Sequence, residues 1–216
     1  MNNIFHYGLF RLFVLFVLLI QNLNGSRNTK SADLPAVEIS KSFPINPFES
    51  NRFYFQSSIF FNFLSGNSND QYQPDIGFGY KISKNLALEG SIFNSNSGGI
   101  SNQIIKGGVQ YYFGSNDTLS WVSSLKKVNF KSLKNYNIDY VTFDISKWIK
   151  YQYNFFRFGL GSTFYKKNNF LSKQKGQVNF IFANIIIPVR IFQLGFEVRM
   201  NPNEFFYSLS LQKNFH

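Results

Sequence analysis

The sequence lacks the residues on which many catalytic and metal sites depend. It contains no cysteine, which excludes disulfide scaffolds, thiolate metal sites and cysteine nucleophiles. Its two histidines are His6, near the N-terminus, and His216, the last residue, so no imidazole lies within the body of the chain. Only carboxylate chemistry stays open, and we therefore expect a protein that is not an enzyme and that binds no cofactor.

Charged residues and long apolar runs are also scarce. Charged residues make up 15% of the 216 residues, against roughly a quarter in typical soluble domains. The mean hydropathy is -0.16. The unbroken apolar run Leu12–Ile20 is shorter than the ~20 residues that a membrane-spanning helix needs. These features exclude a helical membrane protein.

The apolar run lies in a segment ordered like a secretory signal peptide. Arg11 precedes the run, polar residues follow it, and Gly25 is a small residue near its end. We therefore expect residues 1–25 to be a signal peptide. Residues 26–50 contain three prolines and show no strand or helix period, so we predict a periplasmic linker outside the domain of residues 51–216.

Aromatic residues are abundant, at 19% of the chain, and apolar residues recur with a period of two. In the clearest segment, 192–200, apolar residues alternate with Gln, Gly, Glu and Arg, as in a strand with one apolar and one polar face. In another segment Lys147 interrupts the apolar face, which a bulge or another register would explain. The ten predicted strands are 53–63, 76–82, 86–92, 105–113, 118–130, 138–151, 155–165, 177–189, 192–200 and 205–215.

The connections between these segments form a second pattern. Short turns follow the second, fourth, sixth and eighth segments, and longer polar loops follow the first, third, fifth and seventh. Alternation alone also fits a soluble sandwich, whose apolar faces point into a core. Transmembrane barrels have short periplasmic turns and long outer loops. The sequence therefore favours an all-β, antiparallel, up-and-down transmembrane β-barrel of about ten strands.

Residues 77–90, Gly-Phe-Gly-Tyr-Lys-Ile-Ser-Lys-Asn-Leu-Ala-Leu-Glu-Gly, resemble the strand–turn–strand unit of small bacterial outer-membrane β-barrel proteins. That broad family includes the OmpA-like and opacity-type porin-family barrels. The residue-level resemblance covers this hairpin, and the strand and loop pattern extends it to about residues 52–215. It implies an outer-membrane location in a Gram-negative bacterium and assembly by the barrel-assembly machinery. It also implies an alternative count of eight strands, and it implies no particular activity.

The polar faces of the predicted strands would place charged side chains in a narrow lumen. We expect Lys81 to pair with Glu89 across a short turn, and Asp144 to pair likewise with Arg157. The full predicted lumen network consists of Lys81, Glu89, Lys106, Asp144, Arg157, Glu197 and Arg199.

Lysines gather near two of the predicted outer loops, in a chain with a net charge of +11. They predict contact with lipopolysaccharide phosphates or another polyanion, by the attraction that draws basic segments to anionic lipid. The alternative is that they only keep the loops soluble. Export argues against nucleic acid as a partner, despite a pI near 9.7. The two groups are Lys126, Lys127, Lys131 and Lys134, and Lys166, Lys167, Lys173 and Lys175.

These features together predict a non-enzymatic outer-membrane barrel that presents surface loops and serves envelope integrity or adhesion. A narrow porin-like channel for small solutes is the first alternative. It requires unpaired Lys106 or Arg199 along an open path, whereas a fully paired lumen would not conduct. A soluble, secreted β-sandwich or lipocalin-like binding protein is the second alternative, and it would stay in solution without detergent.

Overall fold

The computed structural model of the chain contains ten antiparallel strands. Among the residues it describes, no helix is long and apolar enough to cross a membrane. The described residues are 40, 41, 43–62, 73–97, 100–115, 118–132, 136–168, 173–202 and 204–215. The strands are β1 (Phe53–Asn62), β2 (Gln73–Lys81), β3 (Leu86–Ser97), β4 (Ile100–Ser115), β5 (Thr118–Ser132), β6 (Tyr136–Tyr151), β7 (Asn154–Asn168), β8 (Lys173–Val189), β9 (Phe192–Asn201) and β10 (Glu204–Phe215).

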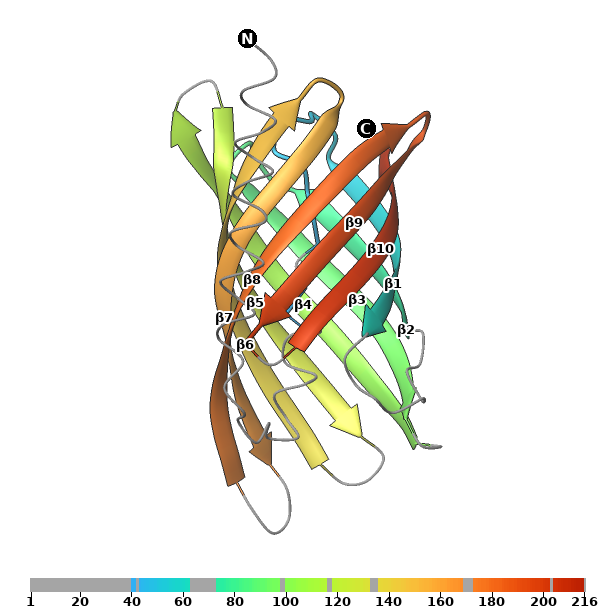
Figure 1. Cartoon of the computed structure of the whole chain (residues 1–216), viewed down its shortest axis with the longest axis vertical. Helices are drawn as coiled ribbons and strands as arrows, with labels where there is room; N and C mark the ends of the chain where they lie inside the picture. The colour runs from blue at the N-terminus through green and yellow to red at the C-terminus, as the bar shows by residue number, and fades with distance from the viewer. Residues whose placement is uncertain are drawn as a thin grey trace.

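The strands close into a barrel (Figure 1). Each strand pairs with its neighbours in the chain, and β1 pairs with β10 from Phe53 opposite Phe215 to Asn62 opposite Phe206. This closure leaves the sheet without a free edge. The predicted up-and-down barrel of ten strands is confirmed, and the alternative of eight strands is wrong. Figure 1 shows β1 beginning and β10 ending at the same end of the barrel.

Residues that alternate with a period of two in the sequence face alternately the outside and the lumen of the barrel. In β9, Phe192, Leu194 and Phe196 are exposed, while Gln193 and Glu197 are buried. Every strand places large apolar side chains on the outside in this way, which is the reverse of a water-soluble sandwich and the arrangement of a transmembrane barrel. Two such side chains from each strand, in chain order, are Phe53, Phe55, Ile76, Phe78, Leu88, Ile92, Ile105, Tyr111, Trp121, Leu125, Val141, Phe143, Leu160, Phe164, Ile185, Ile187, Leu194, Phe196, Leu209 and Leu211.

The predicted long loops after the third, fifth and seventh segments are strand at both ends, and residues 65–72 of the loop after the first segment lie outside the described residues. The polar residues 95–102 were predicted as a loop, yet Ser95 pairs with Asn102 and Ser97 with Ile100 in the β3–β4 ladder. Strands β4 to β8 contain 15 to 17 residues each, more than the ~9–11 that a tilted strand needs to cross a bilayer. Backbone pairing continues through polar sequence because the ladder bonds do not depend on apolar side chains. The barrel therefore projects extended hairpins beyond its apolar band.

Lys147 does not mark a bulge in β6, which pairs in continuous register with both of its neighbours. Its Nζ donates a hydrogen bond to Ser120 Oγ at 2.6 Å and lies 5.0 Å from the ring centroid of Trp121. The aromatic ring and the hydroxyl thus accommodate the ammonium on the outer face. A register shift does occur between Phe113 and Ser115, where Gly114 has a φ of 153° that suits glycine.

Candidate functional site

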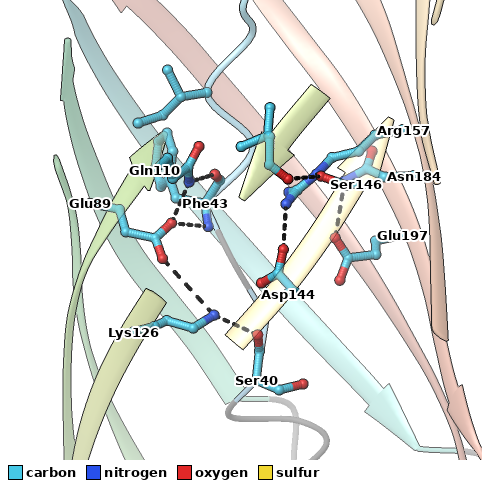
Figure 2. Close-up of polar contacts among 12 residues, drawn as sticks. Ser40, Phe43, Glu89, Gln110, Lys126, Asp144, Ser146, Arg157, Asn184 and Glu197 are labelled. Atoms are coloured by element: carbon cyan, nitrogen blue, oxygen red, sulfur yellow. Dashed lines mark hydrogen bonds and ion pairs between the residues drawn. The ribbon is translucent and has the colours of Figure 1, made fainter. Parts of the chain in front are cut away.

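The lumen of the barrel contains part of the chain that precedes β1. We call residues 40, 41 and 43–50 the lumen segment. The sequence predicted that they belong to a linker outside the domain, and for these residues that prediction is wrong. Figure 2 shows Ser40 and Phe43 among inward-pointing side chains of β3, β4 and β5. The rest of the predicted linker and the predicted signal peptide, residues 1–39, lie outside the described residues.

Two apolar side chains anchor the lumen segment against β2. Ile45 is 0% exposed and Phe43 is 8% exposed. A Cβ atom on Gly79 would lie 2.6 Å from Ile45 Cδ1, and a Cβ on Gly77 would lie 2.9 Å from Phe43 Cδ2. The two glycines therefore leave the space that these side chains occupy. Full burial of one such side chain contributes about 1.5–3 kcal/mol.

Side chains of the barrel wall bind the main chain of the lumen segment (Figure 2). The Phe43 N–H donates to Glu89 Oε2 at 2.7 Å, and Gln110 Nε2 donates to the Phe43 carbonyl at 2.5 Å. Lys126 Nζ donates to the Ser40 carbonyl at 2.5 Å. The bonds made by Glu89 and Lys126 are charge-assisted and therefore stronger than neutral ones. The wall thus holds the segment at its backbone as well as at its apolar side chains.

The lumen segment is also held at the end of the barrel where β1 begins. Lys81 Nζ donates to the carbonyls of Asn46 and Glu49, at 2.6 and 2.5 Å. The Glu49 carboxylate accepts from Gln193 and Asn214. Burial raises the pKa of Glu49 above its usual range, although these hydrogen bonds act in the opposite direction.

The predicted pair of Lys81 with Glu89 is not formed, and the predicted pair of Asp144 with Arg157 is present. Lys81 and Glu89 each bind the lumen segment instead. Arg157 also donates from Nε to Ser146 Oγ at 3.0 Å, and its guanidinium lies 4.8 Å from the ring centroid of Phe182.

Four buried pairs of a cation with a carboxylate line the middle of the lumen. None of the eight side chains is more than 9% exposed, and the barrel wall contributes all of them. The seven residues of the predicted network all lie on the lumen side. Two further members, Asp75 and Lys126, were missed as lumen residues. The pairs are Lys106–Asp75 at 3.2 Å, Lys126–Glu89 at 4.0 Å, Arg157–Asp144 at 3.3 Å and Arg199–Glu197 at 3.0 Å.

Apolar clusters lie on both sides of the charged layer. The first is nearer to the ends of the long hairpins, and the second includes the lumen segment and lies near the short turns. Their members are Ile104, Val128, Phe130, Ile138, Tyr140, Tyr165, Val178, Phe180, Phe182 and Phe206 in the first, and Phe43, Ile45, Tyr54, Ala87, Tyr112, Val122, Trp148, Phe155 and Ile186 in the second.

The described residues leave two cavities of different size near these layers. A cavity beside Lys41, Gln56 and Asp75 measures about 20 Å³, which is room for about one water molecule. A wider cavity of about 520 Å³ lies at the short-turn end, beside Phe48 and Arg52. Within the described part of the chain, no group of three His, Cys, Asp or Glu side chains is placed to hold a metal ion. The lumen is thus packed by side chains at three levels.

The first predicted lysine group does not form one surface. Lys126 is buried in the lumen, whereas Lys127 is exposed on the outside, because successive side chains of a strand point to opposite faces. The prediction of Lys126 as a surface contact is therefore wrong. Lys131 lies in β5, but its side chain is outside the described set, and Lys134 is outside the described residues.

The second predicted lysine group contains a matched pair. Lys166 on β7 lies directly opposite Lys175 on β8, and both side chains are exposed on the outer face. Lys167 is half-buried and lies opposite Gln174. Lys173 begins β8, and its side chain is outside the described set. The structure therefore brings two of the four lysines together.

No protein-family model matches the chain, and no curated protein matches it significantly. Among solved structures, one described as a bacterial polysaccharide outer membrane secretin is 8% identical, with 78% of this chain and 77% of that chain covered and a TM-score of 0.43. The KdgM porin in complex with disordered oligogalacturonate is 6% identical, with 76% and 99% covered and a TM-score of 0.41.

A loop-deletion mutant of OmpT, an outer membrane protein of Vibrio cholerae, is 10% identical, with 78% of this chain and 61% of that chain covered and a TM-score of 0.36. Similarities this low carry no weight for function, and the barrel fold rests on the strand pairing described above. The OmpA-like and opacity-type families are not singled out by these comparisons.

Proposed function

We propose that the protein is a non-enzymatic outer-membrane barrel with a closed lumen, which serves envelope integrity or adhesion through its projecting hairpins. The observation that carries this proposal is the lumen packing. The lumen segment, the four ion pairs and the two apolar clusters occupy the interior where a channel would need water.

The barrel exterior and the predicted signal peptide support the proposed location. A closed sheet with apolar side chains outside satisfies its backbone internally and suits a bilayer. The predicted signal peptide would export the chain, and the barrel-assembly machinery would insert it. The absence of cysteine, and of histidine between His6 and His216, supports a structural role over a catalytic one.

A narrow channel is the competing function, and one observation supports it. The lumen segment forms no strand of the sheet, so its departure would leave the barrel wall closed. A cross-link tests this directly, because the chain has no cysteine of its own. Ile45→Cys combined with Gly79→Cys would join the segment to β2, where Ile45 Cδ1 lies 2.6 Å from the position of a Cβ on Gly79.

Planar-bilayer recordings of the wild-type protein and of the oxidised double-cysteine variant decide between the two functions. We expect no stepwise ion current from either protein. Currents from the wild type that disappear on oxidation of the variant and return on reduction would establish a gated channel and overturn the proposal. A gel-mobility shift on boiling confirms that each reconstituted sample contains folded barrel.

A further inference from the structure

The outer face of β7 and β8 gains polar side chains toward the end of the hairpin. Leu160 and Ile185 are exposed and apolar on the part nearer the short turns. Farther along, Ser162, Gln177 and Asn179 form a hydrogen-bonded cluster on the same face. Ser162 Oγ donates to Asn179 Oδ1 at 2.5 Å, and Gln177 Nε2 donates to Asn179 Oδ1 at 2.9 Å. This cluster offers amide and hydroxyl groups at the margin of the apolar band.

Two lysines complete this face at the end of the hairpin. Lys166 and Lys175 are directly opposite each other, a position in which Cβ atoms are ~4.5–5.5 Å apart and like charges destabilise a sheet. Asp139 is the other cross-strand neighbour of Lys166, and its Oδ1 accepts from Asn129 at 2.9 Å. One carboxylate beside two ammonium groups leaves a net positive charge. An anion between the lysines would replace their repulsion by charge-assisted hydrogen bonds.

The height of the lysines on the barrel indicates the source of that anion. Lys166 is two residues from the end of β7, and Lys175 is two residues after the start of β8. With 15 and 17 residues, these strands exceed the ~9–11 that cross a bilayer, so both lysines lie beyond the hydrocarbon. Phe164, two residues nearer the short turns than Lys166, is exposed and apolar. The face therefore presents apolar, amide and cationic groups within one stretch of hairpin.

We infer that this face, which we call the β7–β8 polar surface (Ser162, Phe164, Lys166, Lys175, Gln177 and Asn179), docks a phosphorylated, acylated sugar lipid of the outer leaflet. Lys166 and Lys175 bind a phosphate between them. Gln177 and Asn179 bind hydroxyl groups of the sugar, Phe164, which lies opposite Gln177, packs against the sugar ring, and the exposed Leu160 contacts acyl chains. The inference rests on the proposed outer-membrane location, in which the end opposite the short turns faces outward.

Equilibrium binding of fluorescently labelled lipid A, measured by anisotropy with the protein purified from membranes in mild detergent, tests the inference. The test variant is Lys166→Gln with Lys175→Gln. The matched control is Lys84→Gln with Lys150→Gln, which removes two exposed lysines at the short-turn end. We expect the test variant to bind at least tenfold more weakly than wild type, and the control to bind as wild type. Enzymatically dephosphorylated lipid A should bind to wild type as weakly as lipid A binds to the test variant.

Three outcomes would overturn the inference: unchanged binding by the test variant, an equal loss in the control, or full competition by millimolar inorganic phosphate. The last would indicate a site for free phosphate. A gel-mobility shift on boiling identifies any variant that fails to fold, and for such a variant Lys166→Gln alone is measured. Fractionation of cell membranes tests the proposed location separately, so a protein absent from the outer membrane would contradict the proposed function without altering the binding result.

Discussion

At the residue scale, the main question is what the buried lumen charges contribute. Removing ions from water is costly, so a buried ion pair adds little net stability, whereas an uncompensated buried charge is strongly destabilising. Arg157 is an example of a buried charge that needs its partners, because it is 1% exposed and donates hydrogen bonds to both Asp144 and Ser146. We infer that these pairs fix which side chains face inward, and that each partner depends on the other.

Asp144→Asn should destabilise the barrel by about 3–5 kcal/mol, because it leaves the Arg157 charge buried without its carboxylate. The measurement is urea unfolding of the detergent-folded protein. The double variant Asp144→Asn with Arg157→Gln should lose less than the sum of the two single losses, since the charges are removed together. Additive losses would show that the pair is not coupled.

Alternation along each strand identifies individual lumen residues that grouping by charge does not. In β5, Trp121 and Leu125 point outward, and the same alternation places Lys126 on the opposite face. Lys126 was instead grouped with its neighbour Lys127 as a run of charge. Asp75 follows the same rule, since it adjoins the outward-facing Ile76. Strand parity thus predicts which face a charge occupies, whereas proximity in sequence does not.

At the scale of the elements, the strands were predictable and the lumen segment was not. A period of two is a local signal, and the predicted strands overlap all ten observed ones. The lumen segment has no period, and its contacts are distant in sequence. Ser40 bonds to Arg199, 159 residues away, and Phe43 bonds to Gln110, 67 residues away. Contacts between residues this far apart leave no local pattern in the sequence.

Gly79→Val should displace the lumen segment, because even its Cβ would lie 2.6 Å from Ile45 Cδ1. Limited trypsin digestion followed by mass spectrometry detects this change at Lys41, which is 6% exposed in the native barrel. We expect Lys41 to be protected in wild type and cleaved in the variant. Gly107→Val is the matched control, because no atom lies within 4 Å of a Cβ built on Gly107. Protection of Lys41 in both variants would contradict the proposed anchoring.

At the scale of the whole molecule, the alternation of apolar and polar residues does not show whether the apolar face of the sheet contacts lipid or a protein core. Two observations favour a barrel whose apolar face points outward to lipid. Strand β1 pairs with β10, and all ten strands expose apolar side chains. The loop pattern supported the same conclusion, although three of the four predicted long loops are strand at both ends. The sequence therefore predicted the architecture more accurately than it predicted the contents of the lumen.

The closed barrel should resist denaturing detergent until it is heated. On a denaturing gel, the unboiled and boiled protein should migrate differently, since an edgeless sheet has no strand at which unfolding readily begins. Absence of a shift, combined with solubility in plain buffer, would contradict a membrane barrel. A shift retained by Gly79→Val would show that the wall closes independently of the lumen segment.

The pairing of Phe53 with Phe215 has a consequence for the order of folding. The seam joins the first strand to the last, so the ring closes only after all ten strands are available for pairing. Contacts this far apart in sequence make folding slow and prolong the time for which open edges are exposed. The lumen segment precedes β1 and lies inside the finished ring, so it either occupies the interior before the seam closes or enters through one end afterwards. In the first case the nascent wall assembles around its own N-terminal segment, and the segment acts as a template for closure.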